Sequence, residues 1–339
     1  MSDVRGDANL SNDTTHIAPM SLSEGGERIS NDCVNAQPPK ESLSNFTFPD
    51  IQTRSTTSAI EVSGLIDAST LPNNAEIVLV GNTNLFMDVN KTLKCIRGDY
   101  TLTLSGGNIL TLNNPEDYAI DVFSVTVSAP LNVISSNVAI AAENGITINN
   151  TVNATSTNTC IGTVNGTISI NADVTVITNS SAAILNRGLD NGGDIIINNG
   201  VIKATGGNSG IWAYGIAARG SITSQAGTII NATGGTGIYA EEGNIHLAGD
   251  VVSIAKGETG SGVYAEAGEV TLSTISVSSS CVGISARNGL TLNGDVEINS
   301  ADTGLGTVNG TLTINADVTA TTNSSAAILN RGLDNGGDI

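Results

Sequence analysis

The residues best suited to bind a ligand are four aromatic side chains that lie within 53 residues of one another: Trp212, Tyr214, Tyr239 and Tyr264. Tyr239 and Tyr264 occupy the same place in the related tetrapeptides Gly-Ile-Tyr-Ala and Gly-Val-Tyr-Ala. Neighbouring residues of a strand point to opposite faces, and the aliphatic residue is expected on the core side. We therefore expect both rings to face solvent. Sugar rings stack on such aromatic surfaces, so the pattern predicts a glycan-binding strip.

Carboxylates border this predicted strip and would accept hydrogen bonds from sugar hydroxyl groups. The residues concerned are Glu241, Glu242 and Glu266. A second interpretation is structural, because aromatic rings on adjacent strands also stabilise a sheet by pairing with one another. In that case the rings would stiffen the fold or cover a loop near residues 192–210. We also expect cross-strand ion pairs of Arg219 with Glu242 and of Arg287 with Glu266, each of small energetic value.

Aspartates recur in turns and raise the question of a metal site. Asp295 lies in Asn-Gly-Asp-Val and Asp317 in Asn-Ala-Asp-Val. Stacked carboxylates repel unless they are exposed or bridged by a cation, so both a Ca²⁺ site and solvated turn residues fit the pattern. Asp190 and Asp194 begin and end Asp-Asn-Gly-Gly-Asp, which lacks the distal acidic residue of an EF-hand loop. We expect no required cofactor, with Ca²⁺ as the one candidate.

The remaining titratable residues do not form a catalytic group. The five lysines are scattered, no two aspartates alternate along one strand, and His16 and His246 have no evident partner. Glycosidases need a placed pair of carboxylates, and lyases need a placed base. We therefore expect that the protein is not an enzyme. A β-helical polysaccharide-processing enzyme, with a carboxylate pair assembled across coils, or its substrate-docking domain, is the alternative.

The tripeptide Arg-Gly-Asp occurs twice, at Arg5-Gly6-Asp7 and at Arg97-Gly98-Asp99. It is an integrin-binding motif, but a motif this short also matches by chance. We expect ordinary turn residues at both places, with adhesion to a host cell as the alternative.

The elements that must position these residues are repeats. Residues 161–195 recur as residues 305–339, with an offset of 144 residues and only five differences. Two of the differences exchange Ile for Leu, and the other three exchange one small or β-branched residue for another. The second copy stops where the first copy runs on, so the sequence reads as a section of a longer array. In such arrays each unit buries its apolar face against its neighbours. We accordingly expect an unpaired C-terminal edge that favours end-to-end self-association.

A shorter repeat lies inside this duplication. A glycine recurs just ahead of an alternating strand, at Gly145, Gly166, Gly188, Gly220, Gly243, Gly268, Gly289, Gly310 and Gly332. The unit from Gly188 to Gly220 is the longest and carries an insertion, and the duplication equals the six units from Gly166 to Gly310. Three short strands per unit, without helical periodicity, predict an all-β right-handed parallel β-helix with about 21–25 residues per coil.

The alternation also predicts which side chains form the core. We expect eight aliphatic residues to point inward in vertical stacks, because a shift of one residue would turn the whole set outward. They are Ile245, Leu247, Val270, Leu272, Leu290, Leu292, Leu312 and Ile314.

Composition divides the chain into three parts. Residues 1–57 are polar and without a period, and we interpret them as a mobile leader. Residues 58–135 contain irregularly spaced strands and are interpreted as an N-terminal cap, and residues 136–339 as the β-helix. The net charge of −19 disfavours binding to nucleic acid or to anionic membranes, and no apolar run is long enough to span a bilayer.

The chain contains four cysteines, and its first residues can be examined for a signal peptide. Cys160 and Cys281 precede strands in equivalent positions, too many coils apart for a mutual disulfide, and we predict that both are core residues. A disulfide between Cys33 and Cys95 is an alternative that the sequence allows. Residues 1–30 contain no apolar segment typical of a signal peptide.

The stretch from Gly192 to Ala217, GGDIIINNGVIKATGGNSGIWAYGIA, resembles the glycine-rich repeats of large bacterial surface proteins. These adhesin-like, carbohydrate-binding-domain-containing proteins occur especially in gut Firmicutes, and the likeness covers residues 136–339. The resemblance implies a secreted, non-catalytic structural or adhesive protein at the cell surface that binds glycans or a host surface. A purely mechanical stalk is the remaining interpretation, favoured by the near-identical duplication.

Overall fold

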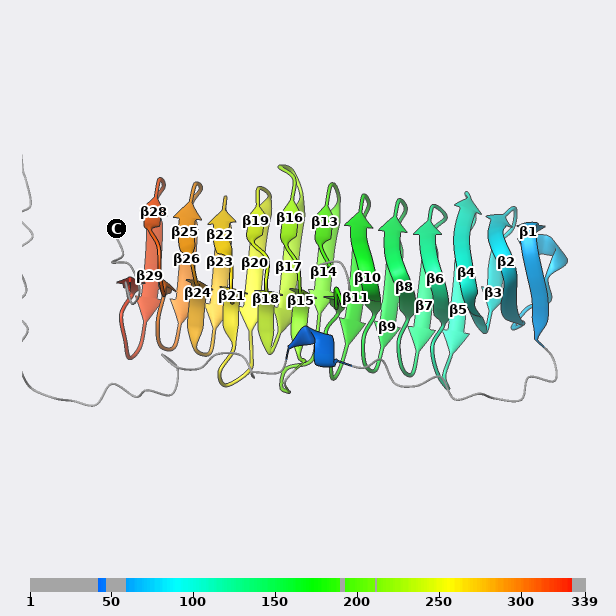
Figure 1. Ribbon diagram of the computed structural model, residues 1–339, viewed down its shortest axis with the longest axis horizontal. Helices are drawn as coiled ribbons and strands as arrows, with labels where there is room; N and C mark the ends of the chain where they lie inside the picture. The colour runs from blue at the N-terminus through cyan, green and yellow to red at the C-terminus, as the bar shows by residue number, and fades with distance from the viewer. Residues whose placement is uncertain (1–41, 47–58, 190–192, 211, 331–339) are drawn as a thin grey trace, which may run out of the picture.

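The computed structural model describes residues 42–46, 59–189, 193–210 and 212–330. It is an all-β parallel solenoid of about twelve turns, elongated along the stacking direction (Figure 1). The predicted fold class is therefore confirmed.

Each coil contributes strands to two sheets. In the larger sheet the early coils supply one long strand each: β1 (Ile60–Asp67), β2 (Glu76–Met87), β4 (Cys95–Gly106), β6 (Ile120–Val127), β8 (Ile140–Ile148) and β10 (Ile161–Ile170).

After β10 each coil supplies two short strands, which continue two separate ladders. The first ladder contains β12 (Ile184–Asn186), β15 (Tyr214–Ala218), β18 (Thr236–Ala240), β21 (Ser261–Ala265), β24 (Val282–Ala286), β27 (Leu305–Thr307) and β30 (Ile328–Asn330). The second contains β13 (Ile195–Ile197), β16 (Ile222–Ser224), β19 (Ile245–Leu247), β22 (Glu269–Leu272), β25 (Gly289–Leu292) and β28 (Leu312–Ile314).

The smaller sheet runs along the opposite side of the coil. Its strands are β3 (Lys91–Leu93), β5 (Leu110–Asn114), β7 (Leu131–Ser135), β9 (Val152–Ser156), β11 (Val174–Thr178), β14 (Val201–Thr205), β17 (Ile229–Gly234), β20 (Asp250–Ala255), β23 (Ile275–Ser279), β26 (Val296–Ser300) and β29 (Val318–Thr322). Two short 3₁₀ helices complete the described elements: η1 (Leu43–Asn45) and η2 (Ala68–Thr70).

Aliphatic side chains from both sheets fill one continuous core along the solenoid. The eight residues predicted to point inward confirm the register: seven are at most 1% exposed, and Ile314 is partly buried against the same core. The described parts of the two duplicated segments form strands at equivalent positions. The long strand β10 corresponds to the two strands β27 and β28, β11 corresponds to β29, and β12 corresponds to β30.

Asparagine side chains form ladders between coils that the sequence analysis did not identify. The Asn171 amide donates to Asn149 at 2.8 Å and accepts from Asn198 at 2.8 Å. Asn315 donates to Asn293 at 2.9 Å in the same way. Such ladders join the turns of adjacent coils and add to the backbone pairing of the strands.

The predicted division at residue 135 is not visible in the ladder. β1, β2, β4, β6 and β8 pair in parallel without a break, and their aliphatic residues belong to the same core as the later coils. Part of the segment predicted to be a mobile leader is also packed: Leu43 is 0% and Phe46 is 8% exposed. In Figure 1 the helix η1 lies beside the middle of the solenoid, far from β1.

The cysteines differ from the prediction in one respect. Cys95 and Cys160 are buried free thiols, and burial raises the pKa of each to about 11. Cys281 is buried as predicted, and it is disulfide-bonded, which the sequence did not indicate. Because Cys95 is a free thiol, the Cys33–Cys95 bridge is wrong. Within the described ranges, no helix is long and apolar enough to cross a membrane.

Candidate functional site

Three tyrosine rings form a stack on the outer surface of the larger sheet. The rings of Tyr214 and Tyr239 are 5.0 Å apart and nearly parallel, with an interplanar angle of 9°. The Tyr239 and Tyr264 rings are 5.8 Å apart at 22°. Tyr239 pairs with Tyr264 in the strand register, while Ile238 and Val263 occupy the core. The predicted outward orientation of Tyr239 and Tyr264 is therefore confirmed.

The expected exposure of these rings is wrong. Tyr214 and Tyr239 are 2% exposed and Tyr264 is 7% exposed, because residues of the N-terminal segment cover them. Leu43 and Phe46 join the three tyrosines in a second apolar cluster, separate from the solenoid core. Side-chain alternation predicts the face to which a ring points, but it does not predict what packs on that face.

Trp212 lies at the edge of this cluster. It is partly buried and meets Phe46 edge to face, with the ring centroids 5.5 Å apart and the planes at 75°. The backbone N–H of Leu43 donates to the Glu241 carboxylate at 2.8 Å. The covering segment is thus held by both an apolar contact and a hydrogen bond to the solenoid.

The free energy of this docking is small by general magnitudes. Burying Leu43 and Phe46 stabilises the docked segment by about 1.5–3 kcal/mol each. Fixing a backbone residue costs about 1–2 kcal/mol, and the segment Ser42–Phe46 has five residues. The burial of these two side chains therefore contributes about 3–6 kcal/mol against a backbone cost of about 5–10 kcal/mol, so it does not by itself hold the segment firmly.

The predicted acidic rim is partly engaged. The Tyr239 hydroxyl donates to the Glu266 carboxylate. Burial raises the pKa of Tyr239 well above its ordinary value, and the hydrogen bond to Glu266 raises it further. Burial likewise raises the pKa of Tyr214, with additional contributions from Glu266 and Glu241. Both phenols therefore stay protonated and able to donate.

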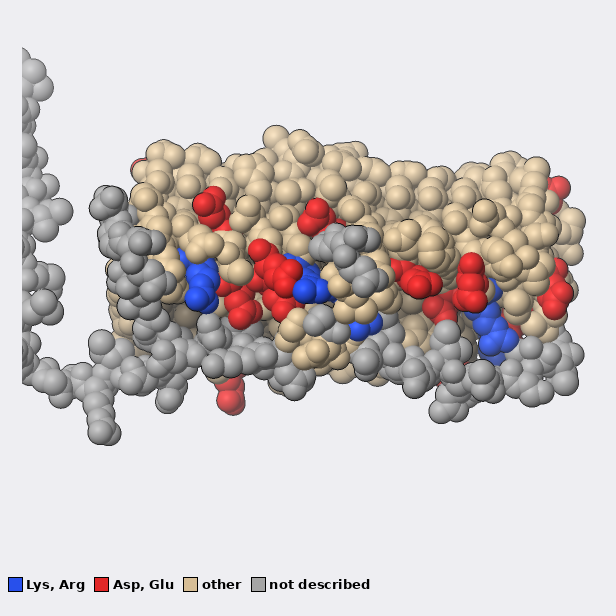
Figure 2. Space-filling model, in the orientation of Figure 1, with Lys and Arg blue, Asp and Glu red and all other residues tan. Residues whose placement is uncertain are grey.

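The predicted ion pairs are half confirmed. Arg219 and Glu242 lie 2.8 Å apart, whereas Arg287 and Glu266 form no ion pair within the described part of the chain. Figure 2 shows charged side chains of both signs along the middle of the viewed face, with a largely uncharged band above them. These charges follow the corner of the coils, where solvent screening keeps each pair of small energetic value.

A groove opens beside the tyrosine stack because three consecutive coils turn the same corner with connections of different length. Residues 206–213 join β14 to β15, Gly235 alone joins β17 to β18, and residues 256–260 join β20 to β21. The short connection forms the floor and the two long ones form the walls.

Backbone hydrogen bonds fix these connections to one another. The Gly235 N–H donates to the Gly207 carbonyl at 2.7 Å, and the Gly257 N–H donates to the Gly235 carbonyl at 3.0 Å. The Thr236 N–H donates to the Ala213 carbonyl at 2.9 Å. The groove is thus preformed rather than assembled by a ligand.

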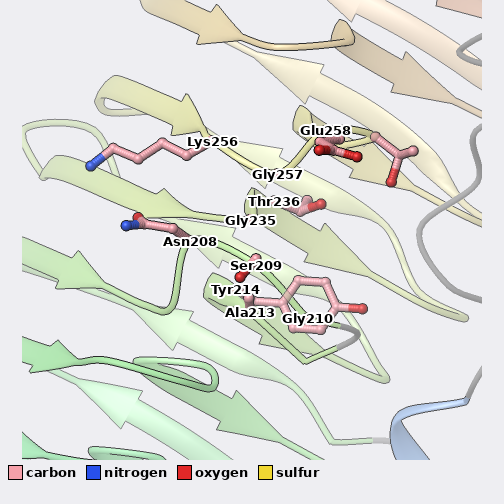
Figure 3. Close-up of a pocket in the computed structure, with 12 residues that line it drawn as sticks. Asn208, Ser209, Gly210, Ala213, Tyr214, Gly235, Thr236, Lys256, Gly257 and Glu258 are labelled. Atoms are coloured by element: carbon pink, nitrogen blue, oxygen red, sulfur yellow. The ribbon is translucent and has the colours of Figure 1, made fainter.

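The groove has a volume of about 610 Å³, which is within the usual range of small-molecule sites. Figure 3 shows Asn208 and Lys256 pointing toward one side, with Glu258 and the Tyr214 ring toward the other. Tyr214 therefore belongs both to the groove and to the tyrosine stack. The polar lining side chains are Asn208, Ser209, Thr236, Lys256, Glu258 and Thr259.

This lining supplies hydroxyl, amide and backbone groups rather than a catalytic pair. Glu258 is the only carboxylate among the lining residues, and no histidine lines the groove. A two-carboxylate mechanism has no second partner there. The lining is instead suited to hydrogen bonds with the hydroxyl groups of a neutral ligand.

Three of the four aspartates considered for Ca²⁺, Asp194, Asp295 and Asp317, lie in the connections between strands. Asp295 and Asp317 are exposed, and their carbonyls accept strand hydrogen bonds from Ile275 and Val296. The Asp194 carboxylate accepts from the Ser221 N–H at 2.7 Å, and Asp190 lies outside the described residues. Among the residues that the structure describes, no three His, Cys, Asp or Glu side chains come close enough to hold a metal ion.

The second Arg-Gly-Asp motif lies inside β4, not in a turn as expected. Its Arg97 guanidinium contacts Glu76 at 2.5 Å, so the cation is already engaged by the neighbouring coil. Arg5-Gly6-Asp7 lies outside the described residues.

One titratable residue was missed by the sequence analysis. Burial raises the pKa of Asp121 to about 6, and the nearby carboxylates of Asp117 and Asp99 raise it further. Asp121 projects outward between Arg97 and Ala141 in the strand register. The raised pKa of Asp121 therefore reflects burial first and nearby carboxylates second, and alternation alone reveals neither cause.

Comparisons of the chain with protein-family models, with curated proteins and with solved structures found no match.

Proposed function

We propose that this protein is a non-catalytic, adhesive segment of a cell-surface protein and that the groove between residues 206–213 and 256–260 binds glycans. The supporting observation is a preformed groove of about 610 Å³ whose lining includes hydroxyl and amide side chains and a single carboxylate. A neutral oligosaccharide fits this chemistry because its hydroxyl groups both donate and accept hydrogen bonds. The solenoid serves as a rigid support that holds the groove away from its attachment point.

The test compares binding of neutral hexasaccharides (cellohexaose, mannohexaose, xylohexaose and N-acetylchitohexaose) to the full chain and to Thr259→Arg. Thr259 is exposed on the groove wall, so the long side chain fills the groove without disturbing the core. The matched control is Thr274→Arg, which adds the same charge at an exposed threonine between β22 and β23. We expect the hexasaccharide that binds the wild type to bind the control equally and Thr259→Arg at least tenfold more weakly, a loss of about 1.4 kcal/mol or more. Equal binding by the three proteins would contradict the groove as the site.

A mechanical stalk is the second candidate, favoured by the duplication. Both copies form strands at equivalent positions, so coils are added without altering the core. Absence of hexasaccharide binding to every protein would favour this role.

A further inference from the structure

The tyrosine stack and the groove are built by the same coils. In the strand register, the outward position occupied by Tyr239 and Tyr264 is held by Ala217 in the preceding coil and by Ser285 in the following coil. The small Ala217 side chain leaves room for the Tyr214 ring, which stacks on Tyr239 and also lines the groove. The aromatic surface therefore continues the groove, and it is confined to the coils that form the groove.

The solenoid does not depend on the segment that covers this surface. The main core contains no residue of Ser42–Phe46, and β15, β18 and β21 are held by parallel pairing to their neighbours. Leu43 and Phe46 belong to the separate outer cluster of apolar residues. Loss of the cover would leave the coils intact and expose the rings.

We infer that Ser42–Phe46 is a removable cover on an aromatic sugar-binding subsite, which extends the groove for a longer neutral oligosaccharide. This inference rests on the proposed function of the groove. Without the cover, the Trp212 ring and the edges of the stacked tyrosines form an exposed apolar surface for the C–H face of a sugar ring. Glu241, which now accepts the Leu43 N–H, is then free to accept a sugar hydroxyl group.

A cover in equilibrium with an open state lowers the apparent affinity by the fraction of open molecules. A variant that cannot dock the cover should therefore bind the same sugar more tightly than the wild type. The full chain with Leu43→Glu and Phe46→Glu provides this variant, because two carboxylates in an apolar contact oppose docking. Asn45→Glu is the matched control, since Asn45 is exposed in the same segment.

Trp212 reports on the cover directly, because it is the only tryptophan of the chain and it contacts Phe46. We expect Leu43→Glu/Phe46→Glu to shift the Trp212 emission to longer wavelength and to make it more accessible to acrylamide. The same variant should bind the hexasaccharide selected above about tenfold more tightly than the wild type. Adding Tyr239→Ala and Tyr264→Ala should remove this gain, and Asn45→Glu should behave as the wild type.

Three results would overturn the inference. Unchanged Trp212 emission in Leu43→Glu/Phe46→Glu would show that the cover is not removed. A shifted emission without tighter binding, or a gain that survives Tyr239→Ala/Tyr264→Ala, would show that the rings do not bind sugar. The Thr259→Arg variant tests the groove independently of the cover. If this variant binds the hexasaccharide more weakly than the wild type, the groove is supported, whether or not the cover variant binds more tightly. Binding by the cover variant alone would support the subsite and contradict the groove.

Discussion

Asp121 shows how stacking of coils changes the chemistry of a single residue. Its carboxyl group lies in an outward column in which neighbouring coils bring Arg97 to one side and Ala141 to the other. Burial is the largest cause of its raised pKa, and the carboxylates of Asp117 and Asp99 add to it. The folded chain therefore holds a proton on Asp121 to about pH 6, while an unfolded chain releases it near pH 4.

The sign of the resulting pH dependence follows from this difference. Between about pH 4 and pH 6 the folded state binds more protons than the unfolded state, so this residue's contribution to stability falls as the pH rises. At pH 7 we expect Asp121→Asn to raise the free energy of unfolding by about 1–2 kcal/mol, after allowance for solvent screening. At pH 4 the variant and the wild type should be alike. Urea unfolding at the two pH values tests this.

Asp317→Asn is the control, because it removes the same charge from an exposed position in a later coil. If Asp121→Asn and Asp317→Asn change stability equally at pH 7, the effect arises from net charge and not from the burial of Asp121.

For other residues, the sequence predicted the orientation of a side chain better than its environment. Alternation in Gly-Ile-Tyr-Ala correctly directed Ile238 inward and Tyr239 outward. It contained no signal for the cover, because Leu43 and Phe46 are isolated apolar residues in a polar segment without a period. Their docking depends on the shape of a surface formed by distant coils.

At the scale of the structural elements, a column of glycines brings the two sheets together. Gly237, Gly262 and Gly283 precede the inward aliphatic residue in three successive coils. A Cβ atom on Gly262 would lie 2.2 Å from a methyl group of Val277 and 2.6 Å from the Gly283 carbonyl oxygen. These glycines allow the larger sheet to approach the side chains of the smaller sheet at this corner.

We expect Gly262→Ala to destabilise the protein by about 2 kcal/mol or more, because the backbone and a packed side chain would both have to move. Gly107→Ala is the matched control, since no atom lies within 4 Å of the added Cβ. The control should change stability by less than about 0.5 kcal/mol. Thermal unfolding followed by circular dichroism measures both, and equal midpoints would contradict the close approach at Gly262.

The groove was not predicted, although the sequence contains a signal for it. Three consecutive coils differ in length, and the middle one is the shortest. They are bounded by Gly188, Gly220, Gly243 and Gly268. Such a series produces a depression when the extra residues fall at one corner. The glycine positions alone do not predict at which corner of the coil the extra residues lie. The strand ends at Thr205, Gly234 and Ala255 locate that corner.

For the molecule as a whole, repetition made the fold predictable and left the function open. Every coil repeats the same inward pattern, so each provides independent support for the solenoid and its register. The site arises where the repeat is broken by longer connections and by aromatic residues. Self-association through an end of the ladder stays a prediction. Within the described ranges, β28, β29 and β30 pair with a neighbour on one side only.

The central claim is that the break in the repeat is where a glycan binds. Hydrogen exchange of the full chain, measured with and without a saturating hexasaccharide, tests it most directly. We predict slower exchange at residues 208–210, at Gly235 and at residues 256–260, which line the groove, and no change at the smaller sheet's outer face. Slower exchange confined to other coils, or no change at saturation, would contradict the claim.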